Sequence, residues 1–195
     1  RATPTFQDLD GDGDLDAFIG GYGNTIYFRN TGSAVSPAFA PSSANPFGLA
    51  AVAQPCDPAF GDLDGDGDLD ALLGQGDGDM AFFRNTGRAL GPLFGASSTN
   101  PFGLSNQGSV SKPALVDLDG DGDLDVIVGI GDGHLTYQRN TGSAIRPAMV
   151  ATTSNPFASF DVGRLATPAF VDIDADGDLD VFIGTEAGHV IFLRN

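Results

Sequence analysis

The sequence predicts an all-β protein made of propeller-type blades, and three observations support that fold class. A nine-residue acidic motif begins at Asp8, Asp62, Asp117 and Asp172, so the repeat steps are 54, 55 and 55 residues. Short apolar runs rich in β-branched and aromatic residues flank each motif, as expected of strands. The chain includes 28 glycines and 12 prolines, and no stretch keeps a helical period. A repeat of about 55 residues with three or four antiparallel strands has the size of one propeller blade, and a linear array of β repeats is the alternative.

The whole chain, residues 1–195, is expected to form a single repeat domain. A proline opens each unit, and an Arg-Asn pair recurs every 55 residues. These landmarks divide the chain into three complete units and one partial unit, with expected boundaries at approximately 1–57, 58–112, 113–167 and 168–195. The prolines are Pro4, Pro58, Pro113 and Pro168, and the pairs begin at Arg29, Arg84, Arg139 and Arg194.

The first unit illustrates the expected order of elements. An apolar segment at 4–6 leads into the acidic motif, and the run 17–19 leaves it as a strand expected to be buried on both faces. A glycine-rich turn follows, where the first unit is one residue shorter than the others, and 25–28 is expected to form a third strand. A segment rich in Ser, Ala, Pro and Asn closes the unit and has room for a short fourth strand.

The acidic motif has the spacing of a calcium loop. Five aspartates within nine residues repel one another unless a cation lies between them. Calcium takes six to eight oxygen ligands, and aspartates at positions 1, 3, 5 and 9 with glycine at position 6 match that demand. We expect position 7 to offer its backbone carbonyl, so that about four Ca²⁺ ions bind, one per repeat. The predicted metal residues are Asp8, Asp10, Asp12, Asp14, Asp16, Asp62, Asp64, Asp66, Asp68, Asp70, Asp117, Asp119, Asp121, Asp123, Asp125, Asp172, Asp174, Asp176, Asp178 and Asp180.

Other interpretations of the motif fit less well. An EF-hand needs a glutamate at position 12, where this chain has Ile19, Leu73, Val128 and Ile183. Magnesium prefers strict octahedral geometry and retained waters, so dense carboxylates favour calcium. A solvated acidic turn without metal remains the plain alternative. The ion is expected to be structural, because a catalytic metal normally keeps an open position.

The charge of the chain excludes one class of partner. The net charge is −17, and each of the four motifs carries five of the 26 acidic residues. Four calcium ions would bring the net charge to −9, which still disfavours nucleic acid as a partner. No apolar run approaches the length of a membrane span.

Four further features have an ordinary structural interpretation. The single cysteine, Cys56, excludes an internal disulfide and is expected to be buried. His134 and His189 occupy equivalent turn positions. The repeated arginines are expected to cap carbonyls or pair with a loop carboxylate, and a repeated sugar or anion contact is the alternative. An aromatic column is expected to pack between blades, and its members are Tyr27, Phe82, Tyr137 and Phe192.

The segment Ala59-Phe-Gly-Asp-Leu-Asp-Gly-Asp-Gly-Asp-Leu-Asp70 and its following strand resemble the FG-GAP or VCBS-type repeat. The resemblance covers the whole chain as four units. It implies an integrin-α-like β-propeller with a calcium loop between the first and second strands of each blade. It also implies an extracellular or cell-surface setting and work in adhesion or ligand binding.

The expected function is therefore that of a non-enzymatic, calcium-stabilised extracellular repeat module for cell adhesion or structural assembly. We expect self-assembly with other copies or further repeats, head to tail, because the partial last unit would leave an open strand edge or apolar face. A protein or glycan is a possible ligand. The first alternative is a lectin-like, carbohydrate-binding propeller, and the second is a calcium-dependent hydrolase domain.

Overall fold

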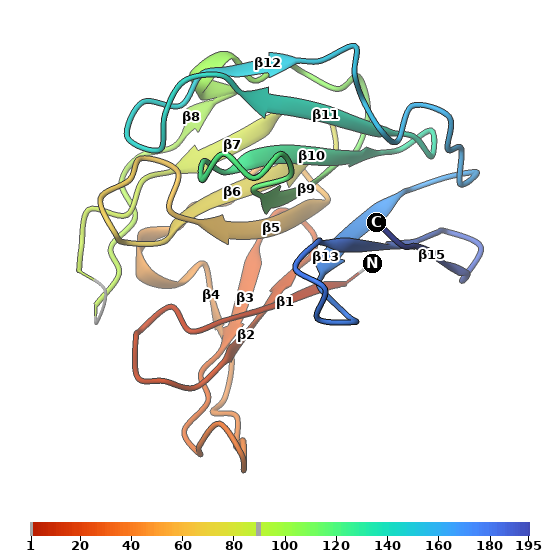
Figure 1. Ribbon diagram of the computed structural model, residues 1–195. Helices are drawn as coiled ribbons and strands as arrows, with labels where there is room; N and C mark the ends of the chain where they lie inside the picture. Colours follow the sequence, from red (N-terminus) through yellow and green to blue (C-terminus); the bar gives the residue numbers. More distant parts are fainter. Residues whose placement is uncertain (1, 89–90) are drawn as a thin grey trace.

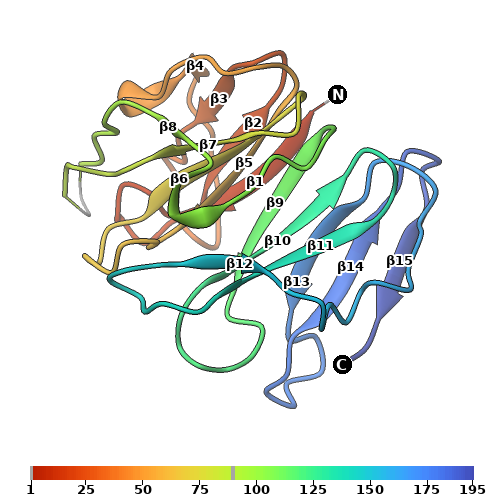
Figure 2. The same ribbon diagram turned by 90° about the horizontal axis from the view of Figure 1, so that it is seen from above.

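The computed structural model describes residues 2–88 and 91–195, which form four antiparallel sheets arranged as a four-bladed β-propeller (Figures 1 and 2). Each sheet is ordered as in the chain, and each strand pairs with its sequence neighbours. The only helical elements of the described residues are the 3-10 turns η1 (Pro46–Gly48) and η2 (Pro101–Gly103). The predicted all-β class is therefore confirmed.

The four sheets are named blades 1 to 4 in chain order. Blade 1 contains β1 (Thr3–Gln7), β2 (Asp16–Gly20), β3 (Thr25–Phe28) and β4 (Ser43–Ala44). Blade 2 contains β5 (Cys56–Gly61), β6 (Asp70–Gln75), β7 (Met80–Phe83) and β8 (Ser98–Thr99). Blade 3 contains β9 (Ser111–Val116), β10 (Asp125–Ile130), β11 (Leu135–Asn140) and β12 (Met149–Ala151). Blade 4 contains β13 (Thr167–Val171), β14 (Asp180–Gly184) and β15 (Val190–Leu193).

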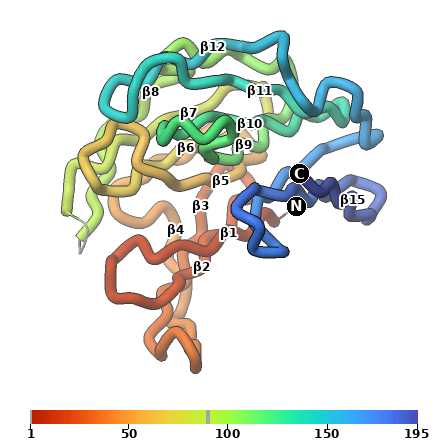
Figure 3. Tube along the Cα trace, in the orientation of Figure 1, coloured from red at the N-terminus to blue at the C-terminus, as the bar shows by residue number. Residues whose placement is uncertain are grey.

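The first strands of the four blades face a common central space. Residues of β1, β5, β9 and β13 together line a channel of about 430 Å³. The chain passes through the blades in sequence order, as the colours of the tube in Figure 3 show. A linear array would not bring all four first strands around one space, so the alternative of a linear β array is wrong.

The second strands are buried as the sequence predicts. Every residue of β6 and β10 is buried. Leu72 of β6 lies opposite Ala59 of β5 and Phe82 of β7, and its side chain has no exposed surface. A run of apolar residues suits this environment, because both faces of the sheet pack against neighbouring blades.

Each junction between blades repeats one packing arrangement. We call the side of a blade that meets the following blade its trailing face, and the side that meets the preceding blade its leading face. At the first junction, Phe18 on the trailing face of blade 1 packs against Phe60 of blade 2, with ring centroids 4.6 Å apart. Three separate core clusters of this kind lie at the three junctions.

Glycine at the end of each second strand lets the blades approach closely. A Cβ built on Gly74 would lie 2.2 Å from the carbonyl oxygen of Ser111 in blade 3. The equivalent glycines Gly20 and Gly129 meet the carbonyls of Cys56 and Ala166 at the same 2.2 Å. Any larger residue at these positions would therefore push neighbouring blades apart.

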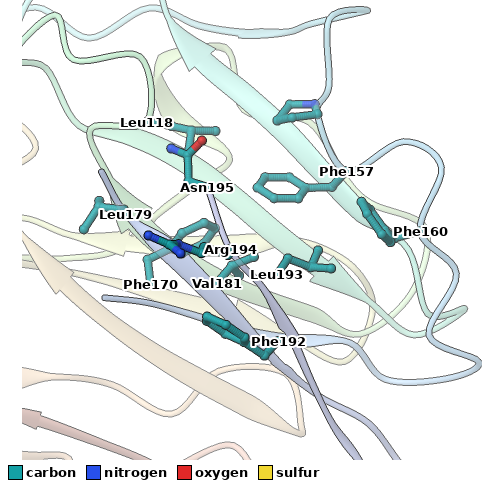
Figure 4. Close-up of a pocket in the computed structure, with 11 residues that line it drawn as sticks. Leu118, Phe157, Phe160, Phe170, Leu179, Val181, Phe192, Leu193, Arg194 and Asn195 are labelled. Atoms are coloured by element: carbon teal, nitrogen blue, oxygen red, sulfur yellow. The ribbon is translucent and has the colours of Figure 1, made fainter. Parts of the chain in front are cut away.

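The outer segments of blades 2 and 3 reach back to the preceding blade. Phe94 is buried, and its backbone N–H donates to the carbonyl of Phe47 across 2.8 Å. The described residues of blade 4 contain three strands, and a cavity of about 520 Å³ lies at its junction with blade 3 (Figure 4). Phe157, Phe160 and Phe170 line this cavity. The fourth sheet is therefore less completely packed than the other three.

Two smaller expectations can be compared with the fold. Cys56 is buried as expected, and burial raises the pKa of its thiol, which disfavours a reactive thiolate. Within the described residues, no helix has the length and apolar character needed to cross a bilayer.

Candidate metal centres

Each acidic motif forms the loop between the first and second strands of its blade. In blade 1 the loop connects β1 with β2, and the corresponding loops precede β6, β10 and β14. The two strands pair along their full lengths, so Gln7 lies opposite Asp16 at the base of the loop. The hairpin therefore brings the beginning and the end of the motif together.

One carboxylate triad lies in each loop. Within each triad, one oxygen from every aspartate lies within 4.8 Å of the others. Two oxygens bound to the same Ca²⁺ lie at most about 5 Å apart, because calcium–oxygen distances are about 2.3–2.6 Å. The triads can therefore hold a metal ion without large rearrangement. They are Asp8, Asp10 and Asp12; Asp62, Asp64 and Asp66; Asp117, Asp119 and Asp125; and Asp172, Asp174 and Asp176.

Unpartnered oxygens identify the best-formed positions. Oδ1 of Asp10 and Oδ1 of Asp64 are buried and have no hydrogen-bond partner among the described residues. Burial of a carboxylate oxygen without a partner costs free energy, because no hydrogen bond or cation replaces the lost hydration. A hard cation between the carboxylates would satisfy both oxygens. The donor set, which consists of carboxylate oxygens alone, suits calcium better than zinc or copper.

The first aspartate of the motif organises the loop backbone. Asp8 accepts hydrogen bonds from the backbone N–H groups of Asp12 and Gly13, at 3.1 and 3.0 Å. Gly13 adopts φ of +92°, a conformation that glycine reaches without strain. In the last loop Ala175 adopts φ of +60°, which costs about 1 kcal/mol for a residue with a Cβ. The last loop is therefore built at a small conformational penalty.

The ninth aspartate lies deeper than the other four. Asp16 is fully buried, and its carboxylate accepts hydrogen bonds from the Tyr27 hydroxyl at 2.8 Å and the Asn30 backbone N–H at 2.7 Å. In blade 2, Asp70 accepts from the backbone N–H groups of Leu63 and Asn85. In blade 3 the ninth aspartate, Asp125, belongs to the triad although it makes the same kind of hydrogen bonds. In the other blades its role as a metal ligand stays a prediction. In every blade the ninth aspartate also accepts a hydrogen bond from the backbone N–H of the asparagine in the Arg-Asn pair.

Burial changes the protonation of the ninth aspartate. Removal from water raises the pKa of Asp16 and of Asp125, against the hydrogen bonds that lower it. The same burial raises the pKa of Asp70 to about 7, and the charge of Asp64 adds to the effect. A cation in the loop would favour the ionised carboxylates, because opposite charge lowers a carboxyl pKa.

The seventh aspartate belongs to none of the four triads. Its backbone N–H donates to the fifth aspartate, as from Asp14 to Asp12 at 3.1 Å. Asp14, Asp68 and Asp123 are half-buried, and Asp178 is exposed. Its carbonyl ligand role stays a prediction.

The repeated arginines lie across the loops. Arg29 Nε lies 2.8 Å from Asp10 Oδ2, and Arg29 Nη2 lies 3.1 Å from Asp12 Oδ2. Arg84, Arg139 and Arg194 pair in the same way with the third and fifth aspartates of their own loops. Pairing with a loop carboxylate, the plainer interpretation, is confirmed. These side chains are about half exposed, so each pair contributes little to stability.

Sequence reasoning missed the role of the asparagine that follows each arginine. The Oδ1 atom of Asn85 accepts hydrogen bonds from the backbone N–H groups of Gly87 and Leu93, both at 3.0 Å. Its own backbone N–H donates to Asp70 at 2.8 Å. Asn30 and Asn140 make the same three contacts. The recurrence of an Arg-Asn pair every 55 residues was the sequence signal that could have indicated a structural role for this asparagine.

The model of the FG-GAP-like repeat matches residues 8–73, 62–128 and 117–183, and the chain belongs to this family. These matches include all or part of each acidic loop. No curated protein matches the chain significantly.

The chain is similar to two solved structures. A lectin from Agrocybe aegerita, which recognises non-reducing terminal N-acetylglucosamine, is 20% identical with a TM-score of 0.53. The match covers 100% of this chain and 52% of the lectin. The rhamnogalacturonan lyase YesW is 12% identical with a TM-score of 0.45, and the match covers 97% of this chain and 41% of the lyase. The chain therefore spans about half the length of the lectin.

Proposed function

We propose that this protein is a non-enzymatic, calcium-stabilised repeat module that serves adhesion or structural assembly outside the cell. Each of its four loops holds one Ca²⁺ ion between the carboxylates of its triad. The ion neutralises charges that otherwise repel one another and fixes the hairpin between the first and second strands. The blades then present a rigid scaffold for contact with other proteins.

One observation carries this proposal: the repeated triad with an unpartnered, buried oxygen on Asp10 and on Asp64. Mutual repulsion among five aspartates would destabilise an ion-free hairpin. The arginine across each loop supplies only one positive charge, and in the first two loops its ion pairs leave Oδ1 of the third aspartate, Asp10 or Asp64, without a partner. A divalent cation completes the balance.

A structural role fits the site better than a catalytic one. The triad lies beside a loop whose backbone N–H groups and arginine already occupy many of the carboxylate oxygens. A catalytic metal keeps a position open for substrate and water. The sites also recur with the same residue types in all four blades, as a structural element of the repeat would.

The proposal can be tested by removing bound metal with a chelator, dialysing the chelator away and titrating the protein with calcium in an isothermal titration calorimeter. We expect about four binding events per chain. Asp64→Asn should weaken binding at one site, whereas Asp68→Asn should leave the stoichiometry unchanged because Asp68 belongs to no triad. Equal effects of the two substitutions, or the absence of binding heat and of terbium luminescence, would contradict the proposal.

A lectin-like propeller that binds carbohydrate is the second candidate. The fold similarity to the Agrocybe aegerita lectin supports it, since that protein recognises N-acetylglucosamine. The arginines do not add support, because all four pair with loop aspartates. A glycan array followed by calorimetry tests this candidate: sugar binding at about one site per blade junction favours the lectin, and an array without specific binding excludes it.

A further inference from the structure

Two faces of the propeller expose apolar residues whose equivalents in the other blades are buried or half-buried. On the trailing face of blade 4, Phe192 is 45% exposed, whereas its equivalents Tyr27 and Phe82 are 7% and 6% exposed. Ile173 is 57% exposed, but its equivalent Leu9 is only 3% exposed. These positions form the trailing half of every junction inside the chain, so blade 4 presents that half to solvent.

The leading face of blade 1 shows the complementary pattern. Phe6 is 56% exposed, although its equivalent Phe60 packs on Phe18 of the preceding blade. Phe39 is 47% exposed, whereas its equivalent Phe94 is 4% exposed. Blade 1 therefore presents the leading half of the same junction.

Gly184 provides an independent observation. At each of its three equivalents, Gly20, Gly74 and Gly129, a Cβ added to the glycine would lie 2.2 Å from a carbonyl oxygen of the next blade. A Cβ on Gly184 would meet only Thr167 of its own blade, at 3.8 Å. Glycine is thus retained at a position where only a further blade would require it.

We propose that the trailing face of blade 4 binds the leading face of blade 1 from a second copy of this chain. Both halves of the contact are present in one chain, and three junctions of the same kind already hold that chain together. The partner is thus a continuation of an established interface. The contact is heterologous, so copies join head to tail into a closed ring or an open filament.

Blade 1 of the same chain does not fill this position. A cavity of about 510 Å³ separates the two faces, with Thr3 and Pro4 on one side and Gly184 and Val190 on the other. The net charge of −17 opposes association of two copies. Bound calcium would reduce this charge, and in that respect the inference rests on the proposed function.

Gly184→Ala is the sharpest test, because it adds one methyl group to the proposed contact and makes only ordinary van der Waals contact with Thr167 within the chain. Sedimentation of the wild-type chain in calcium should show dimers or larger species that increase with concentration. Gly184→Ala should raise the dissociation constant of this self-association at least about tenfold. Its melting temperature and calcium titration should match those of the wild type.

A mixing experiment tests the direction of the contact. Phe6→Asp alters only the blade 1 face, and Val190→Asp alters only the blade 4 face, where Val190 is 68% exposed, so each variant alone should remain monomeric. A mixture of the two still contains one intact pair of faces and should form a heterodimer that grows no further. Tyr22→Asp is the matched control, because Tyr22 lies in the turn between β2 and β3 and is 80% exposed. This variant should associate like the wild type.

A wild-type chain that stays monomeric in calcium at high concentration would overturn the inference, and so would unchanged association in Gly184→Ala. If calcium binds normally in such a monomer, the docking inference fails while the proposed function stands. If copies associate head to tail but bind no calcium, the proposed function fails while the docking inference stands.

Discussion

The side chain of Lys112 lies buried in the second junction, with its Nζ atom 2.7 Å from Oδ1 of Asp57. These residues occupy equivalent places in blades 3 and 2, directly before Pro113 and Pro58. The equivalent residues in the other two blades are Thr3 and Thr167. Lys112 is the only lysine of the chain, so this ion pair interrupts the repeat at one junction.

Breaking this pair should destabilise the protein strongly. Lys112→Met leaves the Asp57 carboxylate buried without a counter-ion, which we expect to cost about 3–5 kcal/mol of unfolding free energy. The double substitution Lys112→Met with Asp57→Leu removes both charges and should recover most of that loss. Urea unfolding of the wild type, Lys112→Met, Asp57→Leu and the double variant measures the coupling free energy between the two residues. Additive losses in the double variant would show that the two residues act separately.

Gly74 should tolerate no side chain, in contrast to Gly184. Gly74→Ala brings a Cβ against the backbone of blade 3 and should reduce the unfolding free energy by at least about 2 kcal/mol. Gly184→Ala, its matched control, should stay within about 0.5 kcal/mol of the wild type. Denaturant melts at low protein concentration compare them. Equal losses would mean that the close approach of blades is not what requires glycine.

Tyr27→Phe isolates the bond between the aromatic column and the acidic loop. The change removes the hydroxyl that donates to Asp16 and leaves a buried carboxylate oxygen without that donor. We expect a loss of about 1–3 kcal/mol in unfolding free energy. Tyr22→Phe, at an exposed position, serves as the control and should have no measurable effect. A neutral Tyr27→Phe would show that water replaces the hydroxyl.

The chelated protein should become less stable as the pH rises from about 4 to about 7. The pKa of Asp70 is raised to about 7 in the folded state, so there the folded protein binds more protons than the unfolded chain. Asp16 and Asp125 shift in the same direction. Excess calcium should flatten this dependence by favouring the ionised carboxylates. Urea midpoints at several pH values measure it, and stability that increases with pH in chelator would contradict this account.

Much of the fold was predictable because the repeat carries it. The constant step between acidic motifs and the apolar runs on both sides predicted the hairpin and the buried second strand in every blade. The triads likewise follow from aspartates at alternate positions of one loop. Local spacing is sufficient for such features, since the residues involved are neighbours in the chain.

The remaining features depend on contacts between blades. The burial of the ninth aspartate depends on contacts outside its loop, as Asp16 shows with the hydroxyl of Tyr27 in the third strand and the backbone N–H of Asn30 beyond that strand. The pairing of Lys112 with Asp57 depends on how two blades meet. Whether a repeat position is buried also depends on its blade, as Phe192 and Tyr27 show.

Thermal unfolding with and without calcium tests the central claim most directly, namely that divalent ions in the aspartate loops stabilise the hairpin between the first and second strands of each blade. At about a hundredfold excess over the dissociation constant, each bound ion adds about 2.7 kcal/mol to stability. The melting temperature measured by calorimetry should therefore rise clearly on adding calcium and fall again in EDTA. Identical melting curves in both conditions would contradict the account.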